Sequence, residues 1–215
     1  MPNWLLIFDL DGTLIDSRRD LCTAVNFVRR RYGRPPLPLE TVAGYVGEGI
    51  RSLMQRSLDV TGADLDEAVA LQKRFYREHM LDETRLYPGV EDGLRRLRAA
   101  GCALAVATNK VVDLSESLLA GLGVRPLFAR VAGDGSTAAL KPDPAMILET
   151  MAELRMPADR TWVIGDGVTD LEAARRAGVH GAWAEWGIGQ RGSEIPERRF
   201  AAFPDVVEFF LNSLS

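Results

Sequence analysis

Two carboxylates, Asp9 and Asp11, lie two positions apart directly after the apolar run WLLIF near the start of the chain. A short apolar run of this kind is typical of a buried strand in a parallel sheet. In open α/β sheets ligands bind just beyond the carboxyl ends of the strands, which is where both acids would lie. Buried acids are costly unless a cation or hydrogen-bond donors compensate them, so the pair predicts metal chemistry at this strand end.

The residues that follow this pair allow two interpretations. In the simpler one, Asp11 and Gly12 form a strand-to-helix turn and Asp9 caps a helix. In the other, one carboxylate is a nucleophile that also binds a divalent cation, while the second carboxylate shuttles protons. Gly12 then lets the backbone approach a phosphate, and its N–H faces the anion together with the N–H of Thr13.

The segment ALAVATNK is a second apolar run that ends in polar residues. Thr108 or Asn109 could begin the next helix while Lys110 points to solvent, which is the simpler interpretation. A hydroxyl at a strand end can equally bind a non-bridging oxygen of a phosphate. The segment by itself leaves both interpretations open.

The segment LKPDP contains Lys141, one of only three lysines among the 26 basic residues, the others being Lys73 and Lys110. Taken alone, it indicates a helix start delimited by proline, with a lysine on the surface. Because the chain otherwise uses arginine, the lysine favours a site that needs a compact ammonium. A fixed ammonium there could offset the charge of Asp9 and of a phosphoryl group in transfer.

The segment TWVIGDGVTD contains two further acids, Asp166 at the end of an apolar run and Asp170 four residues later. Asp170 could simply stabilise a helix N-terminus, an effect of about 0.3–1 kcal/mol. Asp166 repeats the strand-end position of Asp9. Mg²⁺ binds through a few carboxylates together with water and phosphate oxygens, which three acids at one edge of a sheet could supply.

A parallel sheet is needed to bring these segments together, and the sequence predicts one. Short apolar runs indicate buried strands at residues 4–9, 102–108, 127–132, 161–166 and 179–184. Amphipathic stretches predict helices at residues 90–100, 113–121, 144–154 and 169–177. This alternation is typical of an α/β fold with a doubly wound parallel sheet, in which all four segments end at one crevice.

Residues 17–82 interrupt the alternation. They have the apolar periodicity of helices, as at Leu21, Val25 and Val28, and no convincing strand pattern. We therefore expect an α/β core domain of residues 1–16 and 83–215, with a small helical cap domain of residues 17–82 inserted after the first strand. A short apolar helix at residues 204–211 follows a loop to which no chemistry is assigned.

Composition excludes several other classes of protein. The formal net charge of −4 favours neither a nucleic acid nor an anionic membrane as a partner. No apolar run approaches the roughly 20 residues that span a bilayer, and no signal-peptide pattern opens the sequence. Two cysteines without a Cys/His cluster indicate neither a disulfide framework nor a zinc site. We expect a cytoplasmic protein with a small-molecule partner; the sequence leaves monomer and homodimer open.

Four motifs, FDLDGTLIDS, ATNK, LKPDP and IGDGVTD, occur in this order and resemble those of the haloacid dehalogenase superfamily. The resemblance spans nearly the whole chain, and the helical insert is similar to the C1 cap of that superfamily. Within it, the cap stretch YVGEGIRSLMQRSL and the return LYPGV resemble bacterial phosphoglycolate phosphatases. Members of that subfamily often carry serine where this chain has Gly167, which removes a hydroxyl but no implied ligand.

The resemblance implies a Mg²⁺-dependent phosphatase that acts on a small phosphorylated metabolite, with 2-phosphoglycolate as the leading substrate. Asp9 would form an aspartyl phosphate, and Asp11 would protonate the leaving alkoxide and then assist the attacking water. The implied phosphate-binding residues are Gly12, Thr13, Thr108, Asn109 and Lys141, of which Thr108 and Lys141 are also catalytic. The implied metal ligands are the carboxylates of Asp9 and Asp166, the backbone carbonyl of Asp11, and Asp170 directly or through water.

Other members of the same superfamily are the nearest alternatives. Haloacid dehalogenases need no Mg²⁺ and lack an acid equivalent to Asp11, and phosphonatases need a cap lysine, for which the cap offers only Lys73. A sugar-phosphate phosphatase or a β-phosphoglucomutase-like phosphomutase shares all four motifs, so the cap decides between them. Glu48 and Arg51 are the candidate substrate-binding residues of the cap, although Arg51 and Arg56 could equally be exposed helix charges.

A signalling receiver that is phosphorylated on aspartate is an alternative from a different class. It also has acids, a threonine and a lysine at strand ends, but it has no helical insert and its acidic pair is separate from the phosphoacceptor strand. Repeated release of phosphate from many esters would distinguish an enzyme from such a binding switch.

Overall fold

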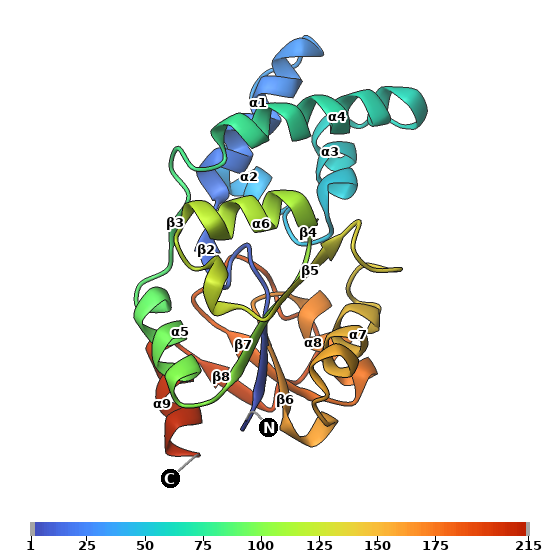
Figure 1. Ribbon diagram of the computed structural model, residues 1–215. Coiled ribbons are helices and arrows are strands. Elements are labelled where there is room, and N and C mark those ends of the chain that lie inside the picture. Colours follow the sequence, from blue (N-terminus) through green and yellow to red (C-terminus); the bar gives the residue numbers. More distant parts are fainter. Residues whose placement is uncertain (1–2, 214–215) are drawn as a thin grey trace.

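The computed structural model describes residues 3–213, which form a six-stranded sheet with the strand order β5-β4-β1-β6-β7-β8 (Figure 1). Every neighbouring pair in this sheet is parallel. The strands are β1 (Leu5–Phe8), β4 (Ala103–Val111), β5 (Arg130–Asp134), β6 (Thr161–Gly165), β7 (His180–Ala184) and β8 (Arg198–Phe200). The predicted fold class, an α/β fold with a doubly wound parallel sheet, is confirmed.

The central strand β1 is buried on both faces, which explains its unbroken apolar sequence. Successive side chains of a strand point to opposite faces. Leu6 and Phe8 accordingly belong to one buried cluster, and Leu5 and Ile7 to another.

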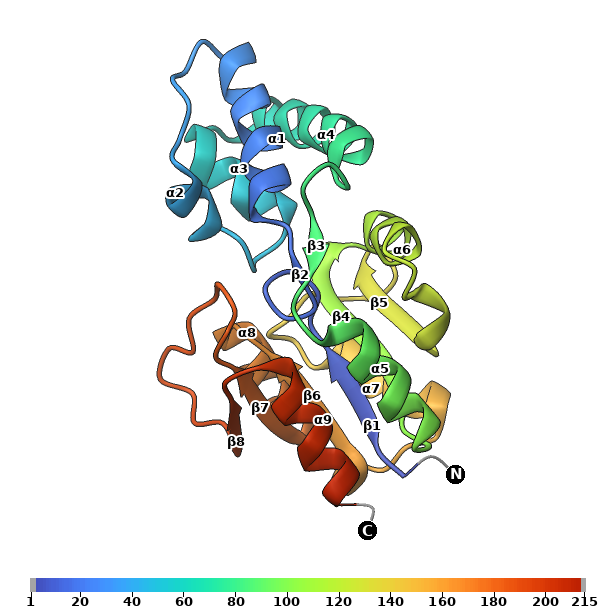
Figure 2. The same cartoon turned by 90° about the vertical axis from the view of Figure 1, so that its left-hand side faces the viewer.

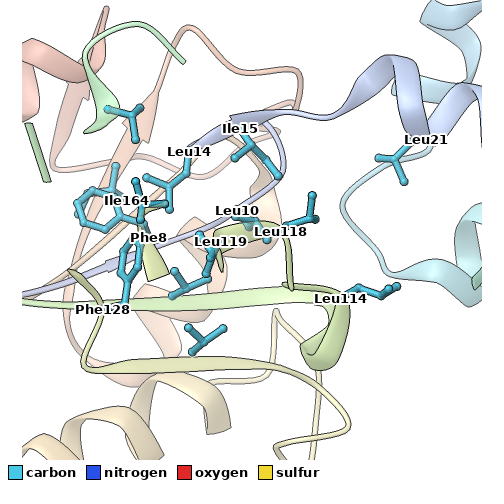
Figure 3. Close-up of a cluster of buried hydrophobic side chains, with 14 of the residues drawn as sticks. Phe8, Leu10, Leu14, Ile15, Leu21, Leu114, Leu118, Leu119, Phe128 and Ile164 are labelled. Carbon is cyan, nitrogen blue, oxygen red and sulfur yellow. The ribbon is translucent and has the colours of Figure 1, made fainter. Parts of the chain in front are cut away.

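Helices cover both faces of the sheet. Three helices of the core pack apolar side chains into the cluster of Leu6 and Phe8, namely α5 (Val90–Ala99), α6 (Val112–Gly121) and α9 (Phe203–Asn212). Those in the cluster of Leu5 and Ile7 are α7 (Ala145–Leu154) and α8 (Val168–Ala177). Figure 3 shows that the loop after β1 is fixed in the first cluster, where Leu10 and Leu14 lie near Leu118 and Leu119. The loop that carries the first acidic motif is thus anchored by its apolar residues.

Four helices stand above the carboxyl ends of the strands, as both views show (Figures 1 and 2). They are α1 (Arg18–Arg31), α2 (Leu39–Ala43), α3 (Ile50–Leu58) and α4 (Gly62–His79). We call residues 17–82 the cap. Two chain segments join the cap to the sheet, and they pair as the short antiparallel strands β2 (Ile15–Asp16) and β3 (Arg85–Leu86).

The chain order places a topological switch at β1. On one side of β1 lie β4 and then β5. The chain then crosses to the other side of β1, where β6 lies. Ligands of open α/β sheets bind at such a switch, outside the carboxyl ends of the strands. Asp9 lies at this point, and its N–H donates to the carbonyl of Ile164 in β6 at 2.9 Å.

The structure differs from the sequence-based expectations at three places. β4 continues to Val111, so Thr108, Asn109 and Lys110 lie within the strand rather than at the start of a helix. The strand expected at residues 127–132 begins later, because Pro126 lies in a 3-10 turn, Arg125–Leu127, that precedes β5. The short strands β2, β3 and β8 were not predicted, since two or three residues carry no alternation pattern.

Within residues 3–213, no helix combines the length and the apolar character that crossing a membrane requires.

Candidate active site

Asp9 and Lys141 form the centre of the candidate site. Lys141 Nζ donates to Asp9 Oδ1 at 2.7 Å, to Asp170 Oδ1 at 2.6 Å and to the carbonyl of Ala107 at 2.5 Å. These three bonds use all the N–H groups of the ammonium. The lysine is almost completely buried, and its position is fixed by the loop after β1, by β4 and by the first turn of α8.

Asp166 is held by the loop that follows β7. Its Oδ2 accepts the backbone N–H groups of Ile188 at 2.8 Å and Gly189 at 2.7 Å. Its Oδ1 accepts the hydroxyl of Thr13 at 3.2 Å. This loop had no assigned role in the sequence, because a backbone donor carries no sequence signature.

Asp170 lies in the first turn of α8, and its two oxygens have different partners. Oδ1 accepts Lys141, while Oδ2 accepts the backbone N–H of Gly167 at 3.0 Å. Oδ2 thus caps the helix, as the simpler interpretation expects, while Oδ1 faces Lys141 and the carboxylate cluster. A Cβ at Gly167 would lie 3.4 Å from Asp170 Oδ2, so glycine is not required there by space.

Asp11 forms a second buried ion pair beside the first. Lys110 Nζ lies 2.8 Å from Asp11 Oδ2 and 3.0 Å from Asp11 Oδ1, and Ser17 Oγ donates to Oδ1 at 2.5 Å. The side chains of Lys110 and Asp11 are 8% and 10% exposed. The expectation that Lys110 points to solvent is wrong, because β4 continues past Thr108 and directs Lys110 toward the loop after β1.

The charges of the site fit a divalent cation. One carboxylate oxygen from each of Asp9, Asp166 and Asp170 lies within 4.8 Å of the others. Lys141 neutralises only one of these three charges, while Lys110 is paired with Asp11. A cluster of buried carboxylates with excess negative charge is the donor set that Mg²⁺ prefers. The three acids predicted as metal ligands are thus brought together.

The ionisation of the two strand-end acids reflects this crowding. Burial raises the pKa of Asp9 well above its usual range; Lys141 opposes this rise, and the charges of Asp170 and Asp166 add to it. Burial also raises the pKa of Asp166, with Asp170 adding to the effect. Burial alone would lower the pKa of Lys141, but Asp170 and Asp9 outweigh it, so the ammonium stays charged.

Gly12 is essential to the packing of the loop, but its predicted backbone role needs correction. Gly12 has φ +93, and a Cβ there would lie 2.1 Å from Asp166 Oδ2. Its N–H donates to the carbonyl of Ile15, and the N–H of Thr13 donates to the carbonyl of Leu10. Neither N–H faces an anion, because the tight turn uses both. Thr13 instead serves the site through its hydroxyl bond to Asp166.

Thr108 and Asn109 have different surroundings. Thr108 is buried beside Asp9 and Asp11 at the edge of a cavity. Asn109 Nδ2 donates to the carbonyls of Gly47 at 2.9 Å and Lys141 at 2.8 Å, while its Oδ1 accepts the N–H of Lys141 at 2.7 Å. The amide of Asn109 thus fixes the Lys141 backbone and ties it to the cap rather than facing a phosphate.

The two candidate substrate-binding residues of the cap, Glu48 and Arg51, have different surroundings. Glu48 lines a cavity of about 340 Å³ together with Asp9, Lys141 and Asp166, and it accepts the hydroxyl of Ser52 at 2.8 Å. Arg51 pairs with Asp66 at 2.5 Å on the exposed surface of the cap. Its side chain lines neither this cavity nor the one described next, so in this conformation the exposed-charge interpretation of Arg51 holds.

A second cavity of about 50 Å³ lies on the other side of the two acids, between the core and the cap. Asp9 and Asp11 line both cavities. The larger cavity contains the carboxylate cluster, and the smaller one contains Lys110 and two residues of α4, Gln72 and Tyr76. The two acids of the first motif therefore lie between a metal-binding side and a second polar compartment.

The match to known proteins agrees with this arrangement. A family model described as haloacid dehalogenase-like hydrolase matches residues 6–184, which is most of the chain. A phosphoglycolate phosphatase of Caulobacter vibrioides is 39% identical over 194 residues, covering 88% of this chain and 82% of the relative. The chain belongs to the haloacid dehalogenase-like hydrolases.

Two further relatives among these hydrolases are also named phosphoglycolate phosphatases. A phosphoglycolate phosphatase of Nitrosospira multiformis is 36% identical, covering 92% of this chain and 89% of the relative. The crystal structure of a predicted phosphoglycolate phosphatase from Haemophilus somnus is 28% identical, with a TM-score of 0.91 and coverage of 96% and 97%. The predicted family, its likeness to bacterial phosphoglycolate phosphatases and the enzyme class are confirmed.

Sequence reasoning missed several residues of this hydrolase site. Ser17 and Lys110 hold Asp11, the backbone of Ile188 and Gly189 holds Asp166, and Tyr76 contacts Lys110 from the cap. Of these, only Lys110 carried a usable signal, namely the rarity of lysine in the chain. The others depend on how distant segments meet in space.

Proposed function

We propose that this hydrolase is a Mg²⁺-dependent phosphatase that acts through an aspartyl phosphate at Asp9, with 2-phosphoglycolate as its leading substrate. The observation that carries the proposal is the pair of acids at the end of β1. Asp9 faces Lys141 and the carboxylate cluster, whereas Asp11 lies beside it on the cap side with its own counter-ion. Two acids in such different surroundings suit two different roles.

In the first step, a carboxylate oxygen of Asp9 attacks the phosphorus atom of a phosphate monoester. An O–P bond forms to Asp9, the bond from phosphorus to the ester oxygen breaks, and the departing alkoxide takes the proton that Asp11 carries when the ester is bound. The alcohol leaves, and Asp11 is left as a carboxylate.

In the second step, water attacks the phosphorus atom of the aspartyl phosphate. Asp11 takes a proton from that water, the bond between phosphorus and Asp9 breaks, and inorganic phosphate leaves. Both carboxyl groups return to their starting states, so the cycle is balanced.

Lys141 and Thr108 support both steps. The ammonium of Lys141, already fixed against Asp9 at 2.7 Å, lies where it would neutralise charge on phosphoryl oxygens. The buried hydroxyl of Thr108 can donate to another of these oxygens. Because both groups are fixed before substrate binds, little reorganisation is needed during the reaction.

The carboxylates of Asp9, Asp166 and Asp170 would hold the metal ion. Bound Mg²⁺ supplies further neutralisation of the phosphoryl charge and helps to orient it.

The proposed substrate draws support from the relatives and from the cap. The curated relatives at 36–39% identity are named phosphoglycolate phosphatases. Of the two cavities that Asp11 lines, the one that also contains Lys110 has a volume of about 50 Å³, which suits a small leaving group.

A steady-state assay of the purified protein against phosphorylated metabolites, with Mg²⁺ present, tests the proposal. We expect the highest kcat/KM for 2-phosphoglycolate and no release of phosphate by Asp9→Asn. A preference for a hexose phosphate or a nucleotide would reject the substrate, and full activity of Asp9→Asn would reject the mechanism.

A further inference from the structure

We propose that Lys110, Tyr76 and Gln72 form a subsite that binds a carboxylate on the leaving group of the substrate. This inference rests on the proposed function, because it concerns the non-phosphate end of the ester that Asp9 attacks. In this proposal, Lys110 of β4 and the α4 residues Gln72 and Tyr76 determine which phosphate monoesters the enzyme prefers.

The ammonium of Lys110 is the charged member of this subsite. It lies 2.8 Å from Asp11 Oδ2 on one side, and on the other side it lies over the ring of Tyr76, 4.6 Å from the ring centroid. Its ion pair with Asp11 stabilises the charged form of the ammonium. An ammonium has three N–H groups, and Asp11 offers it two oxygens. The remaining N–H is available to the hydroxyl of Tyr76 or to an oxygen of a ligand.

Two polar groups of α4 face the same cavity. Gln72 Oε1 is buried and has no hydrogen-bond partner among residues 3–213, and the buried hydroxyl of Tyr76 has the ammonium of Lys110 as its polar neighbour. The two residues are four positions apart, so they project from the same face of the helix. A buried polar atom without a partner is costly, so the oxygen of Gln72 beside this cavity favours a polar ligand there.

Both groups can donate to a carboxylate. Burial raises the pKa of Tyr76 to about 12, so its hydroxyl keeps its proton at neutral pH. The amide of Gln72 can turn to present either its oxygen or its nitrogen to a ligand. Together with Lys110, the subsite therefore offers one charged and two neutral donors, which suits an anionic oxygen acceptor.

The size of the cavity limits what can carry this carboxylate. A single water needs about 10–15 Å³, so a volume of about 50 Å³ admits a group the size of a few waters. The remaining wall is largely apolar and includes Leu21, Ile50 and Leu53. A second phosphate or a sugar ring is too large for this cavity.

The distance to Asp11 fixes where the carboxylate must lie along the substrate. Asp11 has to contact the ester oxygen to protonate it, and Lys110 Nζ lies within 3.0 Å of both Asp11 oxygens. In a 2-phosphoryloxy carboxylate, one carbon separates the ester oxygen from the carboxylate. Both ends can therefore meet their partners at once, as they could not in a longer acid.

A matched pair of substrates tests the subsite. Ethyl phosphate is 2-phosphoglycolate with a methyl group in place of the carboxylate, so both esters need the same chemistry at phosphorus. For Lys110→Met we expect the ratio of kcat/KM for 2-phosphoglycolate to that for ethyl phosphate to fall about 10- to 100-fold, the range for losing a charge-assisted hydrogen bond. Lys73→Met, at a partly exposed lysine of α4 that pairs with Asp113 of α6 outside the cavity, serves as the control and should keep the wild-type ratio.

Two further variants keep the test informative if Lys110→Met is unstable. Tyr76→Phe removes only the hydroxyl and should lower the ratio by about threefold to tenfold. Gln72→Glu adds a negative charge and should lower the ratio further. Each variant is checked first for an unchanged thermal transition, and Tyr76→Phe keeps an aromatic ring beneath the ammonium of Lys110.

The outcomes separate this inference from the proposed function. Equal losses for the two esters in Lys110→Met and Tyr76→Phe would mean that these residues only support Asp11, and the subsite would be rejected. Equal hydrolysis of both esters by the wild-type protein would also reject it, while phosphatase activity would stand. Failure to hydrolyse any ester would overturn the proposed function itself, and the inference with it.

Discussion

Two buried lysines, each paired with one acid of the first motif, define the chemistry at the scale of single residues. Lys141 pairs with Asp9, and Lys110 pairs with Asp11. The third lysine, Lys73, pairs with Asp113 at 3.7 Å on the surface between α4 and α6. A chain that uses arginine elsewhere thus places its two buried lysines where a compact ammonium must fit between oxygens.

Replacing Lys141 tests the importance of its charge. For Lys141→Ala we expect kcat to fall about 100- to 1000-fold, because a fixed group that stabilises the transition state is lost. The matched control, Lys73→Ala, should change kcat by less than about twofold, since exposed ion pairs contribute little. Steady-state kinetics with Mg²⁺ measures both. Near-normal turnover of a folded Lys141→Ala protein would remove this lysine from the mechanism.

The strand-end acids were predictable because each follows an apolar run that only a buried strand explains. Asp9 and Asp166 were identified in this way. The partner of Asp11 was not, because the direction of Lys110 depends on β4 continuing for three residues beyond Thr108. The first two of these residues, Asn109 and Lys110, are polar, so the apolar pattern that marks a buried strand ends before the strand itself does.

At the scale of secondary-structure elements, the hinge between core and cap is held by one buried acid. Asp20, in the first turn of α1, accepts the backbone N–H groups of Glu83 and Thr84 and the hydroxyl of Thr84, at 2.8–3.1 Å. These bonds link the chain segment that enters the cap to the segment that leaves it, next to the β2–β3 pair.

For Asp20→Ala we expect a loss of about 2–4 kcal/mol in the free energy of unfolding, since several donors lose their only partner in a buried place. Denaturant unfolding measures it. Asp92→Ala, an exposed acid in the first turn of α5, is the control and should stay within about 0.5 kcal/mol of wild type. If Asp20→Ala matched this control, the hinge would be held by the β2–β3 pair alone.

The elements of the core were predictable and the contacts of the cap were not. Helices α5 to α8 follow amphipathic periods that begin and end within one residue of the expected positions. The places of Gln72 and Tyr76 depend instead on how α4 packs over the core. Helical periodicity marks an apolar face, but it does not indicate which residues of that face lie over an active site.

At the scale of the whole molecule, crowding of acids makes the stability of the protein depend on pH and on metal. Burial raises the pKa of Asp9 and Asp166 in the folded, metal-free chain. An acid whose pKa is higher in the folded state than in the unfolded state binds more protons when folded. Its contribution to the free energy of unfolding therefore falls as pH rises above about 4, the ordinary carboxyl value, toward the raised pKa.

Mg²⁺ should raise the stability of the folded protein, and the increase should be larger at high pH. The metal needs ionised carboxylates, so its binding must displace the protons that Asp9 and Asp166 hold at low pH. We expect saturating MgCl₂ to raise Tm more at about pH 8 than at about pH 5.5, relative to NaCl of equal ionic strength. Equal shifts at the two pH values, or an undiminished shift in Asp166→Asn, would argue against this metal site.

The parallel sheet, its strand order around β1 and the helical cap together explain why four distant motifs act at one place. The alternation of strands and helices was sufficient to predict this convergence, because only a parallel sheet brings all the strand ends to the same edge.

The most direct test of the account is to identify the residue that carries the phosphoryl group. The protein is mixed with 2-phosphoglycolate and Mg²⁺, quenched in acid during turnover and treated with borohydride, which reduces an acyl phosphate of aspartate to homoserine. Peptide mass spectrometry should find this change at Asp9 alone, and none in Asp9→Asn. Turnover with unmodified Asp9, or modification of another residue, would contradict the central claim.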